Sequence, residues 1–463
     1  MYAMTFIIIA ITLFGLFLIA TETVNRMNKA AVAMFTGVCC WLLYVYHGPM
    51  FIVSEHPVEF VSYLTSHPIT LRTVKEFIAT HIFLGYVAQC AEVVLFLLAT
   101  TSIVEVLNNN GCFDFLTEWL RTRQPKKLLW LLAGLTFLLS ANLDNLATVV
   151  LLLGIVHPLI SNERERRIYS TVIVLAANCG GAITVIGDLT SLRLWTAGLV
   201  TPTAYFMWLV VPVCVALITT LLLMMHTLPT RIQLVNTTPP YRGDDTLLTR
   251  PQRLLMLLVG IGGLWFIPTF HRITLLPPFL GALCVLALLW IVNELCNRTL
   301  LQSDLMVRKR TPLALQYANL QNILYFIGLT LMFAALTETG ALRMLLTFIH
   351  EHVPCDYVIA PVLGGISAFL GNLPVVLGSI SLFHPYEAAG AMGSIAGGSN
   401  FWPLLSYTTA MGGTLLSTGT IAGLLLMRME GVTFSWYLRH ITPKVLAGFA
   451  AGLLVLSAAI CLF

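Results

Sequence analysis

The stretch Ser140-Ala-Asn-Leu-Asp-Asn-Leu-Ala-Thr-Val149 divides an apolar segment, residues 128–160, that is too long for one membrane span. Each half has roughly 14 residues, or about 21 Å of helix at about 1.5 Å per residue, whereas a hydrocarbon core is about 30 Å thick. Both ends of the segment carry basic side chains, which favour the cytoplasmic face: Lys126, Lys127, Arg164, Arg166 and Arg167. The sequence therefore predicts a re-entrant hairpin, whose tip must be buried in protein or line a cavity.

The composition around this segment excludes a soluble globular protein. Of the 463 residues, 58% are hydrophobic and only 10% are charged, against about a quarter charged in a soluble domain. The net charge of +4 is too small and too scattered for nucleic acid binding. The sequence contains no Cys/His cluster with metal spacing, no phosphate-binding loop and no hydrolase elbow, so we expect neither a cofactor nor an enzyme.

Hydropathy predicts ten full membrane spans and a second hairpin. The second hairpin, residues 357–383, is interrupted at Gly371-Asn-Leu-Pro374. The first span lacks the basic start of a signal peptide and is expected to stay in the protein. The predicted spans are 4–20, 30–46, 78–107, 168–187, 205–227, 254–270, 274–293, 318–338, 401–427 and 443–463.

The basic residues predict an orientation in an inner membrane. With ten spans and two hairpins, 20 of the 25 lysine and arginine residues fall on one side, which the positive-inside rule assigns to the cytoplasm. Both termini are then outside. The other side has only Arg72, Lys75, Arg193, Arg272 and Arg343.

The chain also contains an internal repeat. Residues 140–149 and 367–376 are identical at six of ten positions, and three glycines recur with a constant offset (Gly180, Gly181 and Gly187 against Gly412, Gly413 and Gly419). Each half has an odd number of crossings, so the repeat must be inverted. We predict a first half over 1–227 with a broken helix at 168–191, a cytoplasmic linker at 228–253, and a second half over 254–463 with a broken helix at 401–427.

Three carboxylates inside membrane segments are the candidates for chemistry, because burying an ionisable group is costly. Asp144 lies at the first hairpin tip, Asp188 follows the glycine-rich break beside Thr190 and Ser191, and Glu92 lies within a span. Structural alternatives exist for each. Asp144 could simply cap a helix, although a neutral Ser or Asn would cap equally well. Asp188 could pair with Arg193, and Glu92 could be a satisfied structural carboxylate.

The residue types at the tip and the break suit a hard cation. Oxygen ligands from carboxylates, amides, hydroxyls and unwound carbonyls are typical of such sites, and we place a bound cation at Asp144, Asn145 and Asp188. Two carboxylates with no buried lysine or arginine argue against an organic anion. A carboxylate that binds either a cation or a proton couples the movement of the two.

The motifs resemble those of NhaD-type sodium/proton antiporters. The resemblance covers about 92–437 and rests on the first hairpin tip, on Ala177-Asn-Cys-Gly-Gly-Ala-Ile-Thr-Val-Ile-Gly-Asp-Leu-Thr-Ser191 and on Phe401-Trp-Pro-Leu-Leu-Ser-Tyr-Thr-Thr-Ala-Met-Gly-Gly-Thr414. That family belongs to the ion transporter superfamily, with arsenite permeases and dicarboxylate carriers. The resemblance implies two opposed hairpins and two broken helices on a scaffold that often dimerises. It assigns functional roles to Glu92, Asp144, Asn145, Asn178, Asp188, Thr190, Ser191, Asn372, Thr414 and Ser417.

One position departs from the family pattern. The second tip of the family usually reads Asp-Asn, whereas this chain has Gly371-Asn372, which removes a possible proton carrier or ion ligand. We therefore predict an all-α, multi-pass membrane antiporter that exchanges Na⁺ or Li⁺ for protons and contacts the lipid bilayer. The resemblance adds a homodimer as its candidate assembly. The alternatives are an arsenite-type or organic-anion permease on the same scaffold and a degenerate, non-transporting member.

Overall fold

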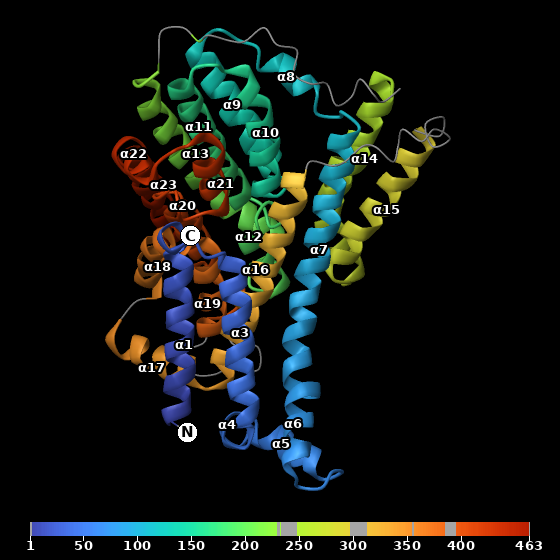
Figure 1. The fold of residues 1–463 in the computed structure, drawn as a ribbon, viewed down its shortest axis with the longest axis vertical. Coiled ribbons are helices and arrows are strands. Elements are labelled where there is room, and N and C mark those ends of the chain that lie inside the picture. Colours follow the sequence, from blue (N-terminus) through green and yellow to red (C-terminus); the bar gives the residue numbers. More distant parts are fainter. Residues whose placement is uncertain are drawn as a thin grey trace.

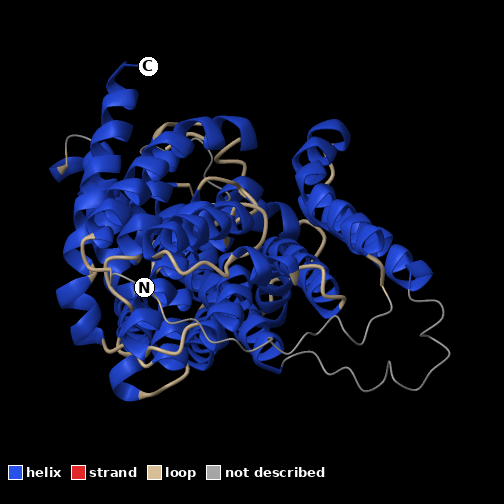
Figure 2. Cartoon of the chain, turned by 90° about the horizontal axis from the view of Figure 1, so that it is seen from above, coloured by secondary structure: helices blue, strands red, loops and turns tan. Residues whose placement is uncertain are grey.

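Helices form every regular element that the structure describes (Figure 2). The computed structural model describes residues 2–228, 232, 248–296, 313–353, 356–384 and 395–462. The predicted all-α, polytopic membrane fold is confirmed. Most of the predicted linker, 228–253, lies outside the described residues.

Eight helices in the described part of the chain are long and apolar enough to cross a membrane. They match eight of the ten predicted spans, because each is a long uninterrupted apolar run. They are α1 (Tyr2–Ala20), α3 (Lys29–Tyr46), α7 (Leu84–Asn109), α13 (Pro202–Met225), α14 (Arg250–Thr274), α15 (Pro278–Cys296), α16 (Leu313–Glu338) and α23 (Thr442–Leu462). Helix α7 continues α6 (Leu71–Phe77) through one π-helical segment, Ile78–Phe83.

The remaining two predicted spans are broken helices. The first consists of α11 (Glu163–Ala182) and α12 (Leu189–Thr196), and the second of α20 (Phe401–Gly413) and α21 (Ile421–Glu430). Glycines let the chain fold back closely at each break. A methyl group on Gly181 would lie 2.8 Å from the carbonyl oxygen of Gly187, and one on Gly413 would lie 3.1 Å from that of Gly419.

Both predicted hairpins form. The first is α9 (Pro125–Ser140) with α10 (Asn145–Leu159), and the second is α18 (Asp356–Leu370) with α19 (Asn372–Phe383). Their arms have 16, 15, 15 and 12 residues, or about 18–24 Å of helix, which is too short to cross a bilayer. The hydroxyl of Tyr169 donates to the carbonyl oxygen of Pro125 at 3.2 Å, so α11 starts beside the start of α9.

The two halves repeat the same contacts. Ser140 Oγ donates to the carbonyl oxygen of Ala177 at 2.7 Å, and the aligned Ser367 Oγ donates to that of Thr409 at 2.6 Å. Ala177 and Thr409 are related by the same offset as the paired glycines. Each hairpin is thus tied to the broken helix of its own half by an equivalent bond, as the sequence repeat predicts.

The hairpins and broken helices form one unit beside a set of long helices. We call α9 to α12 and α18 to α21 the core unit, and α1, α3, α7, α14, α15 and α16 the frame. In Figure 1, α14 and α15 stand on the far side of α7 from the core unit, and α1 and α3 run side by side from the N-terminal end. Five short helices connect the long ones: α2 (Glu22–Asn25), α4 (Gly48–Glu55), α5 (Pro57–Leu64), α8 (Phe115–Trp119) and α22 (Phe434–His440), while α17 (Ala341–His352) precedes the second hairpin.

Candidate functional site

A small cavity lies where four helices of the core unit begin. Its walls come from the starts of α10, α12, α19 and α21 and from the frame helix α16. Its volume is about 30 Å³, which is room for one or two water-sized spheres. The cavity brings together six of the predicted site residues: Asp144, Asn145, Asn178, Asp188, Thr190 and Asn372.

Asp144 caps α10 and lines the cavity. Its side chain is 9% exposed, and Oδ2 accepts a hydrogen bond from the backbone nitrogen of Leu146 at 3.1 Å. The capping role considered as the structural alternative is therefore present. It uses one carboxylate oxygen and does not exclude ion binding, because the same carboxyl group is part of the cavity wall.

Asp188 caps α12 and receives donors from both halves of the chain. It is 9% exposed, and Oδ1 accepts from the backbone nitrogen of Leu189 at 2.8 Å. Its Oδ2 accepts from Thr190 Oγ1 at 2.7 Å and from Asn372 Nδ2 at 3.1 Å. The second hairpin tip thus orients a carboxylate of the first broken helix.

The two asparagines of the first half hold the tip against the break. With its amide oriented so that each polar atom has a partner, Asn145 donates to the carbonyl oxygens of Ala177 at 3.0 Å and Gly187 at 3.1 Å. Asn178 donates from Nδ2 to the carbonyl oxygen of Val174 at 2.9 Å, and its side chain lines the cavity. Both residues fix the shape of the wall that Asp144 and Asp188 share.

The negative charge of the site comes from the first half of the chain. Both charged caps, Asp144 and Asp188, belong to the first half and line the same cavity, whereas the equivalent caps of the second half, Gly371 and Thr420, are neutral. Among the described residues that line the cavity, none is lysine or arginine. Helix N-termini offset part of the negative charge, but two buried carboxylates in one small space still favour a bound cation or proton.

Four predicted residues do not line this cavity. Ser191 completes the capping box of Asp188, and Thr414 donates to the carbonyl oxygen of Met411 at 2.6 Å. Ser417 is buried with no partner for its hydroxyl. Glu92 lies on α7 and is absent from the cavity wall. Their predicted ion-binding roles stay predictions.

The premise that the membrane region contains no buried arginine is wrong. Arg193 is 8% exposed on α12, and its Nη2 donates to Gln89 Oε1 on α7 at 2.6 Å. The sequence could not show this, because Arg193 follows the break and reads as a residue at the end of a span. Its contacts point to the frame and away from the cavity described above.

Sequence reasoning missed two polar residues of the cavity wall. Asn322 comes from α16, and its Oδ1 is buried without a hydrogen-bond partner. Thr420 caps α21 by accepting from the backbone nitrogen of Gly423 at 3.0 Å. The internal repeat could have identified Thr420, because this residue directly follows Gly419 as Asp188 directly follows Gly187. Asn322 had only the weak signal of an amide within a span.

These features define a class: a polytopic membrane transporter in which hairpin tips and broken helices enclose a small polar site. Residues 6–396 match the family described as citrate transporter, and the chain belongs to that family. It is a multi-pass secondary transporter and not an enzyme.

Several curated relatives are named as antiporters. Over 441 residues, 95% of this chain and 96% of the relative, the chain is 30% identical to "Sodium/proton antiporter 2" of Arabidopsis thaliana. It is 28% identical to "Na(+)/H(+) antiporter NhaD" of Vibrio parahaemolyticus over 391 residues, 78% of this chain and 88% of the relative. The predicted resemblance to NhaD-type antiporters is thus confirmed.

Proposed function

We propose that this protein exchanges Na⁺ or Li⁺ for protons across an inner membrane. The observation that carries the proposal is the pair of buried carboxylates, Asp144 and Asp188, in one small cavity that no described lysine or arginine lines. Relatives named sodium/proton antiporters support the same cargo.

Competition at the two carboxylates would couple the ions. With both groups ionised, the cavity carries two negative charges that repel each other, and either one alkali cation or a proton relieves that repulsion. Asp188 is held by Thr190 and Asn372, so its oxygens stay in place when the occupant changes. Because cation and proton occupy the same groups in turn, entry of one releases the other.

The family description, citrate transporter, and the four helix N-termini at the cavity favour a second candidate, an organic-anion permease. Helix N-termini are common anion sites. In this chain, however, aspartates cap two of the four, and an anion would have to approach two carboxylates. Antiport of a small cation therefore fits better, because the cavity volume of about 30 Å³ is too small to hold a tricarboxylate.

Purified protein in proteoliposomes tests the two candidates directly. A Na⁺ gradient should drive proton movement that a pH-sensitive dye reports, Li⁺ should substitute, and protein-free vesicles should show no response. Citrate and arsenite uptake driven by a proton gradient should be absent. Saturable uptake of either solute without Na⁺-dependent proton movement would displace the antiporter proposal, and no movement of any solute would leave a non-transporting protein.

A further inference from the structure

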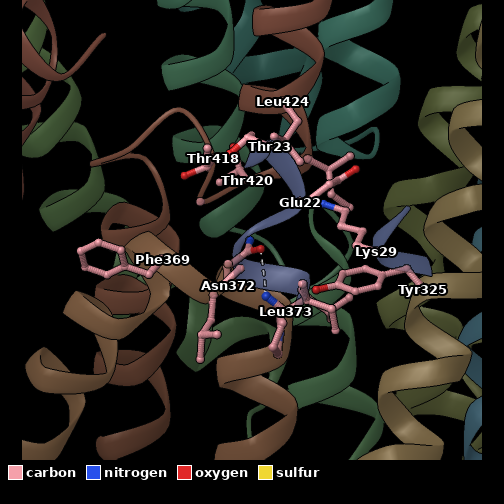
Figure 3. Close-up of a pocket in the computed structure, with 17 residues that line it drawn as sticks. Glu22, Thr23, Lys29, Tyr325, Phe369, Asn372, Leu373, Thr418, Thr420 and Leu424 are labelled. Carbon is pink, nitrogen blue, oxygen red and sulfur yellow. Dashed lines mark hydrogen bonds between the residues drawn. The ribbon is translucent and has the colours of Figure 1, made fainter. Parts of the chain in front are cut away.

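One further cavity adjoins the candidate site, and another adjoins that cavity. The first, of about 20 Å³, lies between the frame and the second hairpin tip, and Figure 3 shows its wall. It shares Asn372 and Thr420 with the candidate site. We call it the inner cavity. The second, of about 720 Å³, reaches exposed Arg26 and Asn28, and we call it the outer cavity. Glu22 and Thr23 line both the inner and the outer cavity.

Glu22 is the buried acidic group at the junction of these two cavities. It lies on α2 and is 7% exposed. Its Oε1 accepts from Arg428 Nη2 at 3.1 Å, whereas Oε2 is buried with no hydrogen-bond partner. A buried carboxylate oxygen without a partner is unfavourable, so this atom is suited to receive a cation or a proton.

The charges around Glu22 indicate weak binding. Arg428 pairs with it from α21, and the ammonium group of Lys29 lies 5.1 Å from the ring centroid of Tyr325 in the wall of the inner cavity. Figure 3 shows Glu22 and Lys29 on the same side of the inner cavity. These positive groups offset the charge of Glu22, while no described lysine or arginine lines the cavity of Asp144 and Asp188. A cation is therefore held less tightly at Glu22 than at the candidate site.

We propose that Glu22 is an entry carboxylate, which binds the transported cation or the competing proton in transit between the outer cavity and the candidate site. This inference rests on the proposed antiport. It commits to one route, from the outer cavity past Glu22 to the wall formed by Asn372 and Thr420. The positive-inside assignment puts Arg26 and Arg428, and hence the outer cavity, on the cytoplasmic side.

Two opposite variants of one ion pair separate this role from a structural one. In vesicles of defined orientation, Glu22→Gln should raise the KM for Na⁺ about tenfold when Na⁺ is supplied on the outer-cavity side, and leave the KM from the other side unchanged. Arg428→Gln frees Oε1 and should lower the KM on the same side several-fold. Breaking a merely structural ion pair would change both variants in the same direction.

Glu294→Gln is the matched control, because Glu294 is an exposed glutamate of α15 that lines neither cavity. It should leave both KM values unchanged. If Glu22→Gln does not reach the membrane, the decrease in KM expected for Arg428→Gln still tests the entry role. Equal shifts on both sides, no shift, or the same direction for both variants would overturn it while exchange persists. If the unmodified protein shows no exchange, this inference and the proposed function both fail.

Discussion

Asp144 and Asp188 each occupy the N-cap position of a helix that begins at the cavity. Capping and the proposed cation binding thus use the same two carboxyl groups, and burial alone does not distinguish the two roles. Asparagine caps a helix about as well as aspartate does, but it has neither the negative charge nor the titratable proton. Substitution by asparagine therefore separates the two roles.

We expect Asp144→Asn and Asp188→Asn each to lower the rate of Na⁺-dependent proton movement by at least about tenfold. Each variant loses a negative charge for which the cation and the proton compete. Protein level and thermal stability in detergent give the second measurement. Asp144→Asn should remain close to the parent. Asp188→Asn should lose more, roughly 1 kcal/mol, since Oδ2 accepts two hydrogen bonds and an amide nitrogen there cannot. Glu105→Gln on α7 is the control and should retain exchange; normal exchange by Asp144→Asn would end the coupling role of the tip.

The backbone conformation of Gly371 disfavours a side chain at the second tip in this chain. Its backbone has φ 95° and ψ 159°, a region that essentially only glycine adopts and that costs other residues about 1–3 kcal/mol. Gly371→Asp and Gly371→Ala should both lose roughly that much stability, measured by thermal unfolding. Only the aspartate adds charge, so a shift in apparent Na⁺ affinity that Gly371→Ala lacks would place position 371 at the site. Identical affinities in two folded variants would place it away from the ion.

The carboxylates that the sequence identified share one physical signal, which is a charge within an apolar segment. That signal gave Asp144 and Asp188, which line the cavity, and Glu92, which does not. Four neutral residues of the cavity wall lack that signal, and resemblance assigned their roles: Asn145, Asn178, Thr190 and Asn372. Glu22 had no such signal, because it lies two residues after the end of the first span and reads as a residue at the membrane surface. Its hydrogen-bond partner, Arg428, is 406 positions away.

At the scale of elements, close packing of each hairpin against a broken helix depends on glycine. A methyl group on Gly180 would lie 2.2 Å from the carbonyl oxygen of Phe137, and one on the equivalent Gly412 would lie 2.0 Å from that of Gly364. Real side chains do not approach backbone so closely, so the helices would have to move apart. Two other glycines, Gly154 on α10 and Gly365 on α18, have nothing within 4 Å of such a methyl group.

Four alanine variants test this packing. Gly180→Ala and Gly412→Ala should each cost about 1–3 kcal/mol through overpacking and should lower the exchange rate, because the displaced helices carry the cavity wall. Gly154→Ala and Gly365→Ala should be neutral or stabilising by up to about 1 kcal/mol, as alanine favours helix over glycine. Thermal unfolding in detergent and dye-reported exchange measure the two effects. Equal tolerance of all four variants would contradict the packing.

The sequence predicted those helices whose presence follows from the length and hydropathy of an apolar segment. The ten spans and two hairpins follow from runs of about 20 apolar residues and from the polar tips within longer runs. The short helices α4, α5 and α8 were not predicted, because a criterion based on the length of a membrane span does not detect helices of 8, 8 and 5 residues. The breaks at 183–188 and 414–420 were indicated by their paired glycines.

At the scale of the whole molecule, the site is assembled from both halves and the frame. The bond from Asn372 to Asp188 joins residues 184 positions apart, and Asn322 is supplied by the frame helix α16. No local pattern encodes such contacts. The inverted repeat predicted equivalent tips and breaks in each half. Only the resemblance implied that they meet at one cavity, and the structure supports this.

The re-entrant hairpin fixes a topology that chemical labelling can test. Gln124 and Ser161 are exposed and flank the two arms of the first hairpin, just before α9 and just after α10. An antiparallel pair of arms about 22–24 Å long returns the chain to the side from which it came. Single cysteines at both positions, in a cysteine-free background, should therefore be shielded from a membrane-impermeant thiol reagent added outside.

Ser66, in the exposed loop between α5 and α6, is the matched position on the outer side of the membrane. Helices α1 and α3 cross the membrane in turn, so the chain is again outside after α3. The nearby Arg72 and Lys75 belong to the few basic residues that are assigned to the outside. A cysteine at Ser66 should react in intact cells, whereas cysteines at Gln124 and Ser161 should react only after permeabilisation. Labelling of Gln124 and Ser161 from opposite sides would make α9 and α10 a full crossing. The second half would then keep the orientation of the first, and the inverted repeat on which the two-sided cavity depends would be wrong.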